Sequence, residues 1–521
     1  MPFHFKALIL VMVITLIMFA LAKPLFTRFM AEQDFNRRRN TWLVLTLAAF
    51  LIPNFWAFTV LAAIVIAYAT SKDSNPAALY LFLLLTLPPI REDIPTLDVV
   101  RQIFGLDHLR LLSLALLLPT ALKLMSSTGP YAIGASGSRM RRGLQAADVL
   151  FLLYAAIQFA LMLPYDSVTS STRRALLIGI DMLLPYFVLS RVCRNREMVA
   201  EAMAGFTLAM IVLAPLSVVE FIQGWILYAG LEERWGAAHM IGYLKRGDFL
   251  RAQVTGGHSI VLGYAFAVGL GFCLYVQARF GSRAWRSLAV LTVLAGLIAT
   301  LARGPWVGAV AAVLVFLALG PNATSRSIKA LALLAVAGAI ALATPLGDKL
   351  ANHLPFVGTL DVGSVSYRQK LAEVSWYLIW QHPFFGSPNF MQYMEELRQG
   401  EGIIDLVNGY AAVALVYGLV GFSFFTGFFA VTAIGCFRAV RRFAAFDPDS
   451  ASMGAGLLAS LVGALVVLGT TSNYLSIPYI YWSLGALAFA YSRLSLSDEA
   501  RYAYAASDER PSVLGRVSSQ G

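Results

Sequence analysis

Three arginines lie at the borders of apolar or amphipathic segments, namely Arg251, Arg303 and Arg368. A cation beside such a segment costs free energy unless an anion compensates it. A guanidinium group binds phosphate oxygens in pairs. Gly304-Pro305 predicts a tight turn and a helix that begins at Pro305, so Arg303 would stand beside a helix N-terminus, which itself favours anions. The three arginines therefore predict a clamp for a phosphate or diphosphate. The alternatives are arginines that are solvated, paired with carboxylates or extended toward lipid headgroups.

Proton-transferring side chains occur in the same parts of the chain. His258 follows Arg251 and the pair Gly256-Gly257, which allows close approach of the backbone. The other histidines expected on this side have no metal-binding spacing and are more simply polar residues, namely His239, His353 and His382. The carboxylates that are either bases or loop-solubilising groups are Asp361, Glu395, Glu396, Glu401 and Asp405. No nucleotide-binding motif or nucleophile elbow is present, so we expect no cofactor and no metal.

Membrane helices must hold these residues in place. Of the 521 residues, 58% are hydrophobic and 13% are charged, which is more apolar surface than a soluble domain of this length can bury. We therefore predict an all-α, polytopic integral membrane helix bundle. The net charge of +11 lies in short loops beside apolar runs, which indicates loops facing anionic lipid and not nucleic acid binding. Cys193, Cys273 and Cys436 are far apart and offer neither a disulfide framework nor a metal site.

The apolar runs predict about 14 spans of roughly 30 Å of hydrocarbon. They lie near residues 7–22, 41–69, 76–90, 108–124, 147–164, 172–192, 198–222, 257–279, 284–301, 304–320, 327–345, 406–437, 452–470 and 473–492. The run 41–69 contains Pro53-Asn54 and is either one kinked span or two short helices, which leaves the side of the N-terminus open. The run 7–22 lacks a convincing signal-peptide cleavage site and is taken as the first span.

Basic clusters at every second connection predict the orientation. They are Arg139, Arg141 and Arg142; Arg191, Arg194 and Arg196; Arg279, Arg283 and Arg286; Arg326 and Lys329; and Arg438, Arg441 and Arg442. The positive-inside rule places these loops in the cytoplasm. The outer face then receives loops 223–256 and 347–405 together with the turn around Arg303. We expect N-terminal helices over 1–200, a core over 201–440, C-terminal helices over 441–492 and a disordered cytoplasmic tail over 493–521.

The long outer loop 347–405 contains a further helix. Its apolar positions at helical spacing are Leu371, Val374 and Leu378. This pattern predicts an amphipathic helix over Ser366–Gln381 that lies at the membrane surface. Ser364 or Ser366 would cap its start, and Pro383 would end it.

Four segments resemble the O-antigen ligase and polysaccharide polymerase superfamily. They are RAQVTGGHSIVLGY (251–264), LARGPWVGA (301–309), SYRQKLAEVSWYLIWQHPFFGSPNF (366–390) and NGYAAVALVYGLVG (408–421). The resemblance covers residues 200–440, and the earlier spans match in hydropathy only. It implies that Arg303 and Arg368 bind the diphosphate of an undecaprenyl-linked donor glycan and that Arg251 assists them.

One position departs from this family. The ligases carry a histidine, assigned to activating the acceptor hydroxyl, directly before the residue equivalent to Asn408, whereas this chain has Val407. The base would then be Asp405, Glu401 or His258. The further positions expected to bind substrate are Gly256, Gly257, Trp306, Trp376, Trp380 and Asn408, and the two tryptophans of the outer helix would cover the site and stack on sugars.

The resemblance implies a metal-independent glycosyltransferase of the bacterial inner membrane. It would polymerise undecaprenyl-diphosphate-linked repeat units of an exopolysaccharide or O-antigen on the periplasmic face. The alternatives are a ligase that passes the glycan to a lipid or protein acceptor, and a transporter of lipid-linked sugars, although polar residues gathered on one face favour an enzyme. The expected partners are the lipid-linked donor and acceptor, membrane lipid and chain-length or export proteins.

Overall fold

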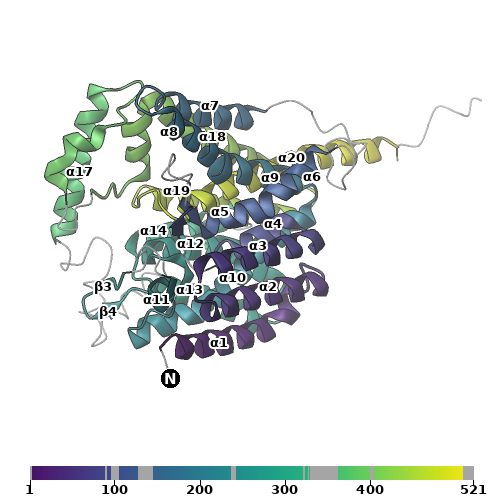
Figure 1. The fold of residues 1–521 in the computed structure, drawn as a ribbon. Helices are drawn as coiled ribbons and strands as arrows, with labels where there is room; N and C mark the ends of the chain where they lie inside the picture. The colour runs from purple at the N-terminus through teal and green to yellow at the C-terminus, as the bar shows by residue number, and fades with distance from the viewer. Residues whose placement is uncertain are drawn as a thin grey trace, which may run out of the picture.

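A computed structural model describes residues 3–87, 91–94, 105–126, 145–235, 242–320, 323–326, 328, 332, 362–398 and 404–508 (Figure 1). The elements of the first part are α1 Phe3–Phe26, α2 Glu32–Leu51, α3 Phe55–Lys72, α4 Pro76–Leu83, β1 Arg91–Asp93, β2 Gly105–Asp107, α5 His108–Leu112, η1 Ser113–Leu117, α6 Leu118–Met125, α7 Ala146–Ala160, α8 Val168–Ile178, η2 Gly179–Leu183, α9 Leu184–Val192 and α10 Arg196–Gln223. Those of the second part are α11 Ala229–Trp235, β3 Lys245–Arg246, β4 Phe249–Leu250, η3 Val254–Gly256, α12 Ser259–Val276, η4 Gln277–Arg279, α13 Arg283–Ala299, α14 Arg303–Leu319, α17 Val362–Gln381, η5 Phe390–Leu397, α18 Gly409–Phe443, α19 Pro448–Leu468 and α20 Ile477–Asp508. The chain is all-α, as predicted. The strands of the described residues form two short antiparallel pairs, β1 with β2 and β3 with β4.

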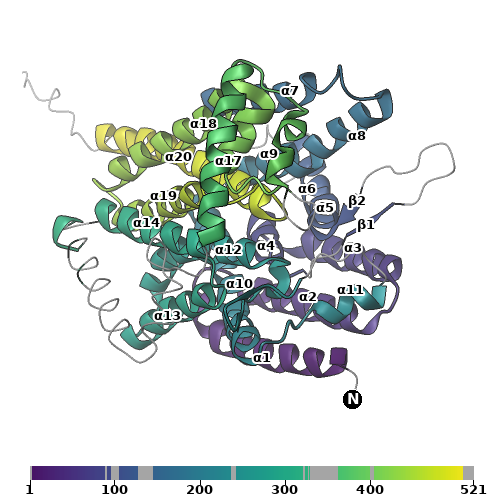
Figure 2. The ribbon, with the colours of Figure 1, turned by 90° about the vertical axis from the view of Figure 1, so that its left-hand side faces the viewer.

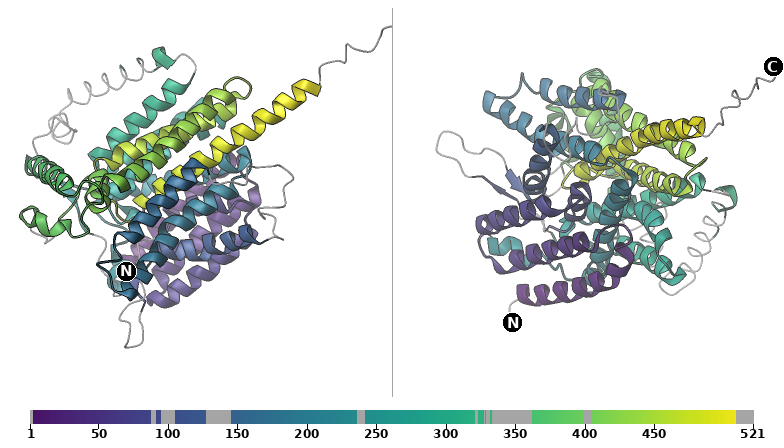
Figure 3. Two further views of the ribbon diagram at one scale, coloured as in Figure 1. Left: turned by 90° about the horizontal axis from the view of Figure 1, so that it is seen from above. Right: turned by 90° about the vertical axis from the view of Figure 1, so that its right-hand side faces the viewer.

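The helices form a bundle in which they run roughly side by side (Figure 3). Eight helices of the described ranges are long and apolar enough to cross a membrane. The nearly fully buried α12 lies among α10, α13, α14 and α19. Because α14 and α19 meet through glycines, their backbones lie close together: a Cβ added to Gly308 would lie 2.7 Å from the carbonyl oxygen of Gly463. This contact places the first turn of α14 beside the last turn of α19.

Several predicted spans differ from the observed helices. The run 41–69 is two helices, because Asn54 caps α3 by accepting a hydrogen bond from the N–H of Ala57 at 2.9 Å. The prediction of a span at 76–90 is wrong, since α4 has eight residues and ends at Leu83. The run 327–345 falls almost entirely outside the described residues.

The ends of the predicted regions also shift. The tail is helical as far as Asp508, because α20 continues past the expected boundary at residue 493. The boundaries predicted at 200/201 and 440/441 fall inside α10 and α18. Both divisions therefore lie a few residues inside the ends of continuous helices.

Helix α17 lies across one end of the bundle (Figures 1 and 2). It ends at Gln381, before Pro383, as predicted, but it begins at Val362, so the predicted serine cap is wrong. Leu371 and Leu378 are buried against η5 and α18, which confirms the apolar face of this helix. Among residues 366–381 of this helix, the large apolar side chains that remain exposed are Trp376, Tyr377 and Trp380. The helix therefore docks by one face and presents aromatic rings on another.

Candidate functional site

Arg251 lies against the turn that leads to Arg303. The N–H of Arg251 donates to the carbonyl of Leu244 at 2.9 Å, and the N–H of the next residue, Ala252, donates to the carbonyl of Ala299 at 3.1 Å. The first bond joins the segment after β4 to the residue before β3, and the second fastens it to the end of α13. The guanidinium Nε of Arg251 then reaches the carbonyl oxygen of Thr300 at 3.5 Å. Thr300 is three residues before Arg303, so this contact brings two of the three predicted arginines to one place. Both Arg251 and Arg303 are half-buried.

Arg303 is the first residue of α14, two residues earlier than the helix start predicted at Pro305. The adjacent Gly304 packs directly on Thr470, and an added Cβ there would overlap the threonine hydroxyl. The indole N–H of Trp306 donates to the carbonyl of Leu297 at 3.2 Å and so closes the turn between α13 and α14. In this structure Trp306 therefore serves to hold the turn, while Arg303 stands at the positive end of a helix dipole.

His258 is the N-cap of α12. Its Nδ1 accepts a hydrogen bond from the N–H of Ile260 at 3.1 Å, so the neutral ring carries its proton on Nε2. Burial, aided by the positive charge of Arg251, lowers the pKa of His258 to about 3. The ring also meets Tyr474 edge to face, with centroids 5.3 Å apart. With Nδ1 accepting this bond, the neutral ring offers its Nε2–H as a donor, and this favours binding of a substrate oxygen over the general-base role considered for His258.

Asp405 also lies near Tyr474. Ser472 bonds its carboxylate and also reaches the carbonyl of Leu406 at 2.8 Å. Burial raises the pKa of Tyr474, and the nearby charge of Asp405 raises it further, while Arg251 acts in the opposite direction. The phenol thus keeps its proton, and the loop 472–474 connects the predicted carboxylate with the predicted arginine and histidine.

Helix α17 reaches this site through Tyr367. Its hydroxyl lies 3.2 Å from both the backbone carbonyl and the backbone N–H of Asp405. Arg368 is the next residue and is exposed, so the third predicted arginine stands on the helix that docks beside the carboxylate. Trp376 and Trp380 lie farther along α17, and their rings meet edge to face with centroids 5.6 Å apart.

The remaining predicted positions have mainly backbone roles. Asn408 caps α18, accepting hydrogen bonds from Tyr410 N–H at 3.0 Å and Ala411 N–H at 3.2 Å. Gly257 has φ +69°, a conformation that favours glycine, and Gly256 packs on Leu262. Glu401 lies outside the described residues, as do His239, His353 and Asp361.

Unfavourable backbone conformations gather in these loops. Within the described ranges, the non-glycine residues with positive φ are Val254 (+43°), Leu301 (+47°) and Leu475 (+49°). One precedes His258, one precedes Arg303 and one follows Tyr474. Such residues cost on the order of 1–3 kcal/mol each and tend to occur at functional sites, where the surrounding structure holds them. Their coincidence with the polar residues marks this end of the bundle as the candidate site.

Glu220 is a site residue that the sequence reasoning missed. It is fully buried in the last turn of α10 and accepts three backbone hydrogen bonds, from Gln253 at 2.8 Å, Val254 at 2.9 Å and Leu227 at 2.9 Å. It therefore fixes the strained loop between Arg251 and His258. The signal was available, because a carboxylate near the end of an apolar span is a functional candidate by default. Tyr367, Ser472 and Tyr474 gave no such signal.

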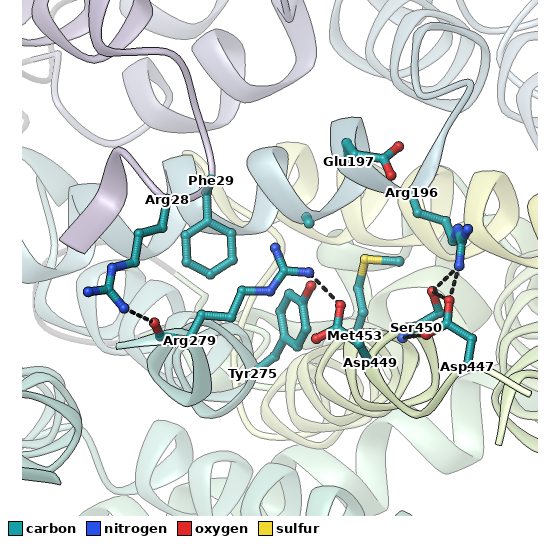
Figure 4. Close-up of a pocket in the computed structure, with 11 residues that line it drawn as sticks. Arg28, Phe29, Arg196, Glu197, Tyr275, Arg279, Asp447, Asp449, Ser450 and Met453 are labelled. Carbon is teal, nitrogen blue, oxygen red and sulfur yellow. Dashed lines mark hydrogen bonds and ion pairs between the residues drawn. The ribbon is translucent and has the colours of Figure 1, made fainter. Parts of the chain in front are cut away.

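The opposite ends of α12 and α19 form a different polar pocket, with a volume of about 220 Å³ (Figure 4). Arg279 pairs with Asp449 and Arg196 pairs with Asp447, while Arg28 donates to the carbonyl of Arg279 at 2.7 Å. Helices of 18 and 21 residues separate this pocket from the candidate site by roughly 30 Å. Two of the basic clusters predicted to be cytoplasmic thus share the end that lies away from the site.

Residues 288–426 match the family model described as O-antigen ligase. This confirms the resemblance predicted from the motifs, since Arg303, Arg368, Asp405 and Asn408 lie in the matched range. Arg251 and His258 lie before it and join the site through the fold. A comparison with curated proteins gives no match.

Proposed function

We propose that this protein is a glycosyltransferase that polymerises undecaprenyl-diphosphate-linked repeat units of an exopolysaccharide or O-antigen. The observation that carries the proposal is the convergence of Arg251, Arg303, His258 and Asp405 at one end of the bundle. The O-antigen ligase match over residues 288–426 supports transfer of a lipid-linked glycan as the reaction class.

The reaction needs a clamp for the leaving group and a proton acceptor. A hydroxyl of the acceptor sugar attacks the anomeric carbon of the donor, and the bond between that carbon and the diphosphate oxygen breaks. Undecaprenyl diphosphate leaves with the electron pair of this bond, and the hydroxyl proton passes to a carboxylate and then to water. Positive groups arranged in advance around the leaving group lower the barrier most, because charge develops there in the transition state.

The residues divide between these two tasks. Arg251 and Arg303, with the N-terminus of α14, hold the diphosphate, and the Nε2–H of His258 and the hydroxyl of Tyr474 donate to its oxygens. Arg368 supplies a further cation from α17. Asp405 is exposed and held by Ser472, which suits a carboxylate that receives the proton from the acceptor. Glu401 remains the alternative base.

The charge distribution supports an assignment of the membrane face. The basic clusters around Arg196 and Arg279 lie at the end opposite the site, and positively charged loops remain in the cytoplasm. The site would then face the periplasm of a bacterial inner membrane. Trp376 and Trp380 project from α17 on this side, where they would stack on the sugars of the growing chain.

A ligase is the second candidate, and the description of the matching family favours it. The same clamp would serve both reactions, because both release the same diphosphate. Val407 stands where the ligases carry a histidine, and the described residues offer Asp405 in its place. The two reactions differ in the acceptor, which is a second lipid-linked repeat unit for the polymerase.

The test is conversion of a purified undecaprenyl-diphosphate repeat unit by the full chain in detergent, without ATP or added metal. Arg303→Ala and Arg368→Ala are compared with Arg279→Ala, whose arginine lies at the other end of the bundle. We expect a ladder of products from the wild type and Arg279→Ala, and at least about 100-fold lower rates from Arg303→Ala. A single product that requires an added acceptor lipid would identify a ligase. No product, together with movement of lipid-linked sugar across proteoliposomes, would refute the enzyme and identify a transporter.

A further inference from the structure

A large cavity borders the candidate site. Its volume is about 570 Å³, and its walls come from α7, α8 with η2, the first turns of α18 and the start of α20. Asn473 lines the cavity, while its neighbours in the chain, Ser472 and Tyr474, contact Asp405 and His258. The loop 472–474 therefore borders the cavity through Asn473 and the candidate site through Ser472 and Tyr474.

The cavity is lined by buried polar groups that the protein itself does not pair. Tyr154 and Tyr481 are only 5% and 4% exposed, and within the described residues neither hydroxyl makes a hydrogen bond to protein, nor does that of Tyr417. The carbonyl oxygen of the Asn473 side chain is buried without a partner in the same part of the chain. The amide N–H of Gln158 reaches only the thioether of Met182, at 3.3 Å. Buried polar groups are normally hydrogen-bonded, so these groups suit a ligand rich in donors and acceptors.

The charged groups that line the cavity balance in formal charge, since Asp166 and Asp181 stand against Arg173 and Arg174. Asp181 is held by Arg110 at 2.9 Å and by the hydroxyl of Tyr479. Asp166 pairs with Arg174 at 2.8 Å. Since these carboxylates and arginines neutralise one another, the cavity does not favour a diphosphate. Asp181 lies in the π-helical turn η2, a distortion that often occurs at functional sites.

These features match the chemistry of a neutral sugar. Its hydroxyls both donate and accept hydrogen bonds, and its C–H faces pack on aromatic rings such as those of Tyr417 and Trp482. We propose that this cavity binds the acceptor saccharide and presents its reacting hydroxyl to Asp405. The proposal rests on the proposed transfer reaction for the role of acceptor, while the binding of a neutral saccharide stands by itself.

The experiment measures binding of the lipid-free oligosaccharide released from the purified donor, using the full chain in detergent and saturation-transfer NMR or calorimetry. The double variant Tyr154→Phe, Tyr481→Phe removes two cavity hydroxyls and little else. The control is Tyr264→Phe, because its hydroxyl is also buried and unpaired but is not among the groups that line this cavity. Within the described residues these hydroxyls make no hydrogen bond to protein, so melting temperatures should stay unchanged.

We expect saturable binding to the wild type and to the control, and about 5- to 100-fold weaker binding to the double variant. Inorganic pyrophosphate should not compete with the oligosaccharide. In the transfer assay the double variant should raise the KM for the acceptor and leave that for the donor unchanged. No saturable binding to the wild type, or equal binding to the double variant, would overturn the proposal. Binding that depends on these hydroxyls without any transfer would sustain the sugar site and reject the proposed function.

Discussion

Replacing Glu220 tests whether the strained loop beside His258 must be held in place for catalysis. One carboxylate oxygen accepts hydrogen bonds from Gln253 and Val254, and the other accepts one from Leu227. Val254 has φ +43°, which a β-branched residue adopts only under constraint. Without these bonds we expect the loop to relax toward an ordinary conformation and to move Arg251 and His258 away from the diphosphate.

The size of the effect follows from the number of bonds lost. Glu220→Gln keeps one oxygen, which can still serve Gln253 and Val254, and turns an NH₂ group toward the N–H of Leu227. A buried donor left without an acceptor costs about 1–3 kcal/mol. Glu220→Ala leaves three such donors, or about 3–9 kcal/mol in total, and is expected to unfold this end of the bundle. If Glu220→Gln raises the free energy of the transition state by this amount, its transfer rate drops about 5- to 150-fold.

The assay compares the transfer rate per folded molecule with the melting temperature in detergent. Glu197→Gln is the matched control, since Glu197 is exposed in the first turn of the same helix, at the opposite end. We expect a lower rate and a modestly lower melting temperature for Glu220→Gln, and no change for the control. A glutamine variant that melts earlier but transfers at the wild-type rate per folded molecule would refute the positioning role.

Three further predictions concern the same loops. The pKa of His258 in the folded protein is about 3, below its ordinary 6.5, so between these pH values the unfolded chain binds one more proton than the folded protein. The free energy of unfolding therefore decreases as the pH falls through this window, by up to about 1.4 kcal/mol per pH unit. His258→Gln should flatten the dependence of the melting temperature on pH in this window, and an unchanged dependence would contradict the low pKa. Tyr367→Phe removes both bonds to the backbone of Asp405 and should speed amide hydrogen exchange at residues 404–406, whereas equal exchange would show that α17 docks without them. Gly257→Ala and Gly224→Ala both place a side chain at positive φ, so each should destabilise the fold by about 1 kcal/mol. Only Gly257→Ala should reduce the transfer rate. Equal losses of activity in the two variants would argue against a special role for Gly257.

The sequence predicted the type of the elements better than the contacts between them. Alternating basic loops indicated that Arg251, Arg303 and Arg368 share one face, because the positive-inside rule needs only the sequence of each loop and no contacts between loops. The apolar face of α17 was also predictable, since Leu371 and Leu378 repeat with the helical period. The bond between Ala252 and Ala299, which brings Arg251 to the turn before Arg303, joins residues far apart in sequence that carry no local signal.

The residues with positive φ show why the conformation of these loops could not be predicted from the sequence. Val254, Leu301 and Leu475 are residue types that favour ordinary helix or strand conformations, so no local preference indicates positive φ. Tertiary contacts impose it, as the bonds of Glu220 show for Val254. The proton position on the ring of His258 depends on tertiary structure in the same way, because the N–H of Ile260, at the start of α12, favours a donor role over the base role considered for it.

The distribution of charge along the bundle bears on the choice between enzyme and transporter. The sequence of α12 between His258 and Arg279 contains no charged residue, and neither does that of α14 after Arg303 or α19 after Asp449. The fully buried Arg38 is bound by Asp73 and Glu201, each at 2.7 Å, and Glu201 lies in the second turn of α10, near the end opposite the site. A diphosphate that crossed the membrane beside α12, α14 and α19 would meet no compensating cation for most of its path, at a large desolvation cost. A lipid-linked donor that enters sideways would need its diphosphate compensated at one depth only, and under the proposed function the half-buried Arg251 and Arg303 would supply that charge.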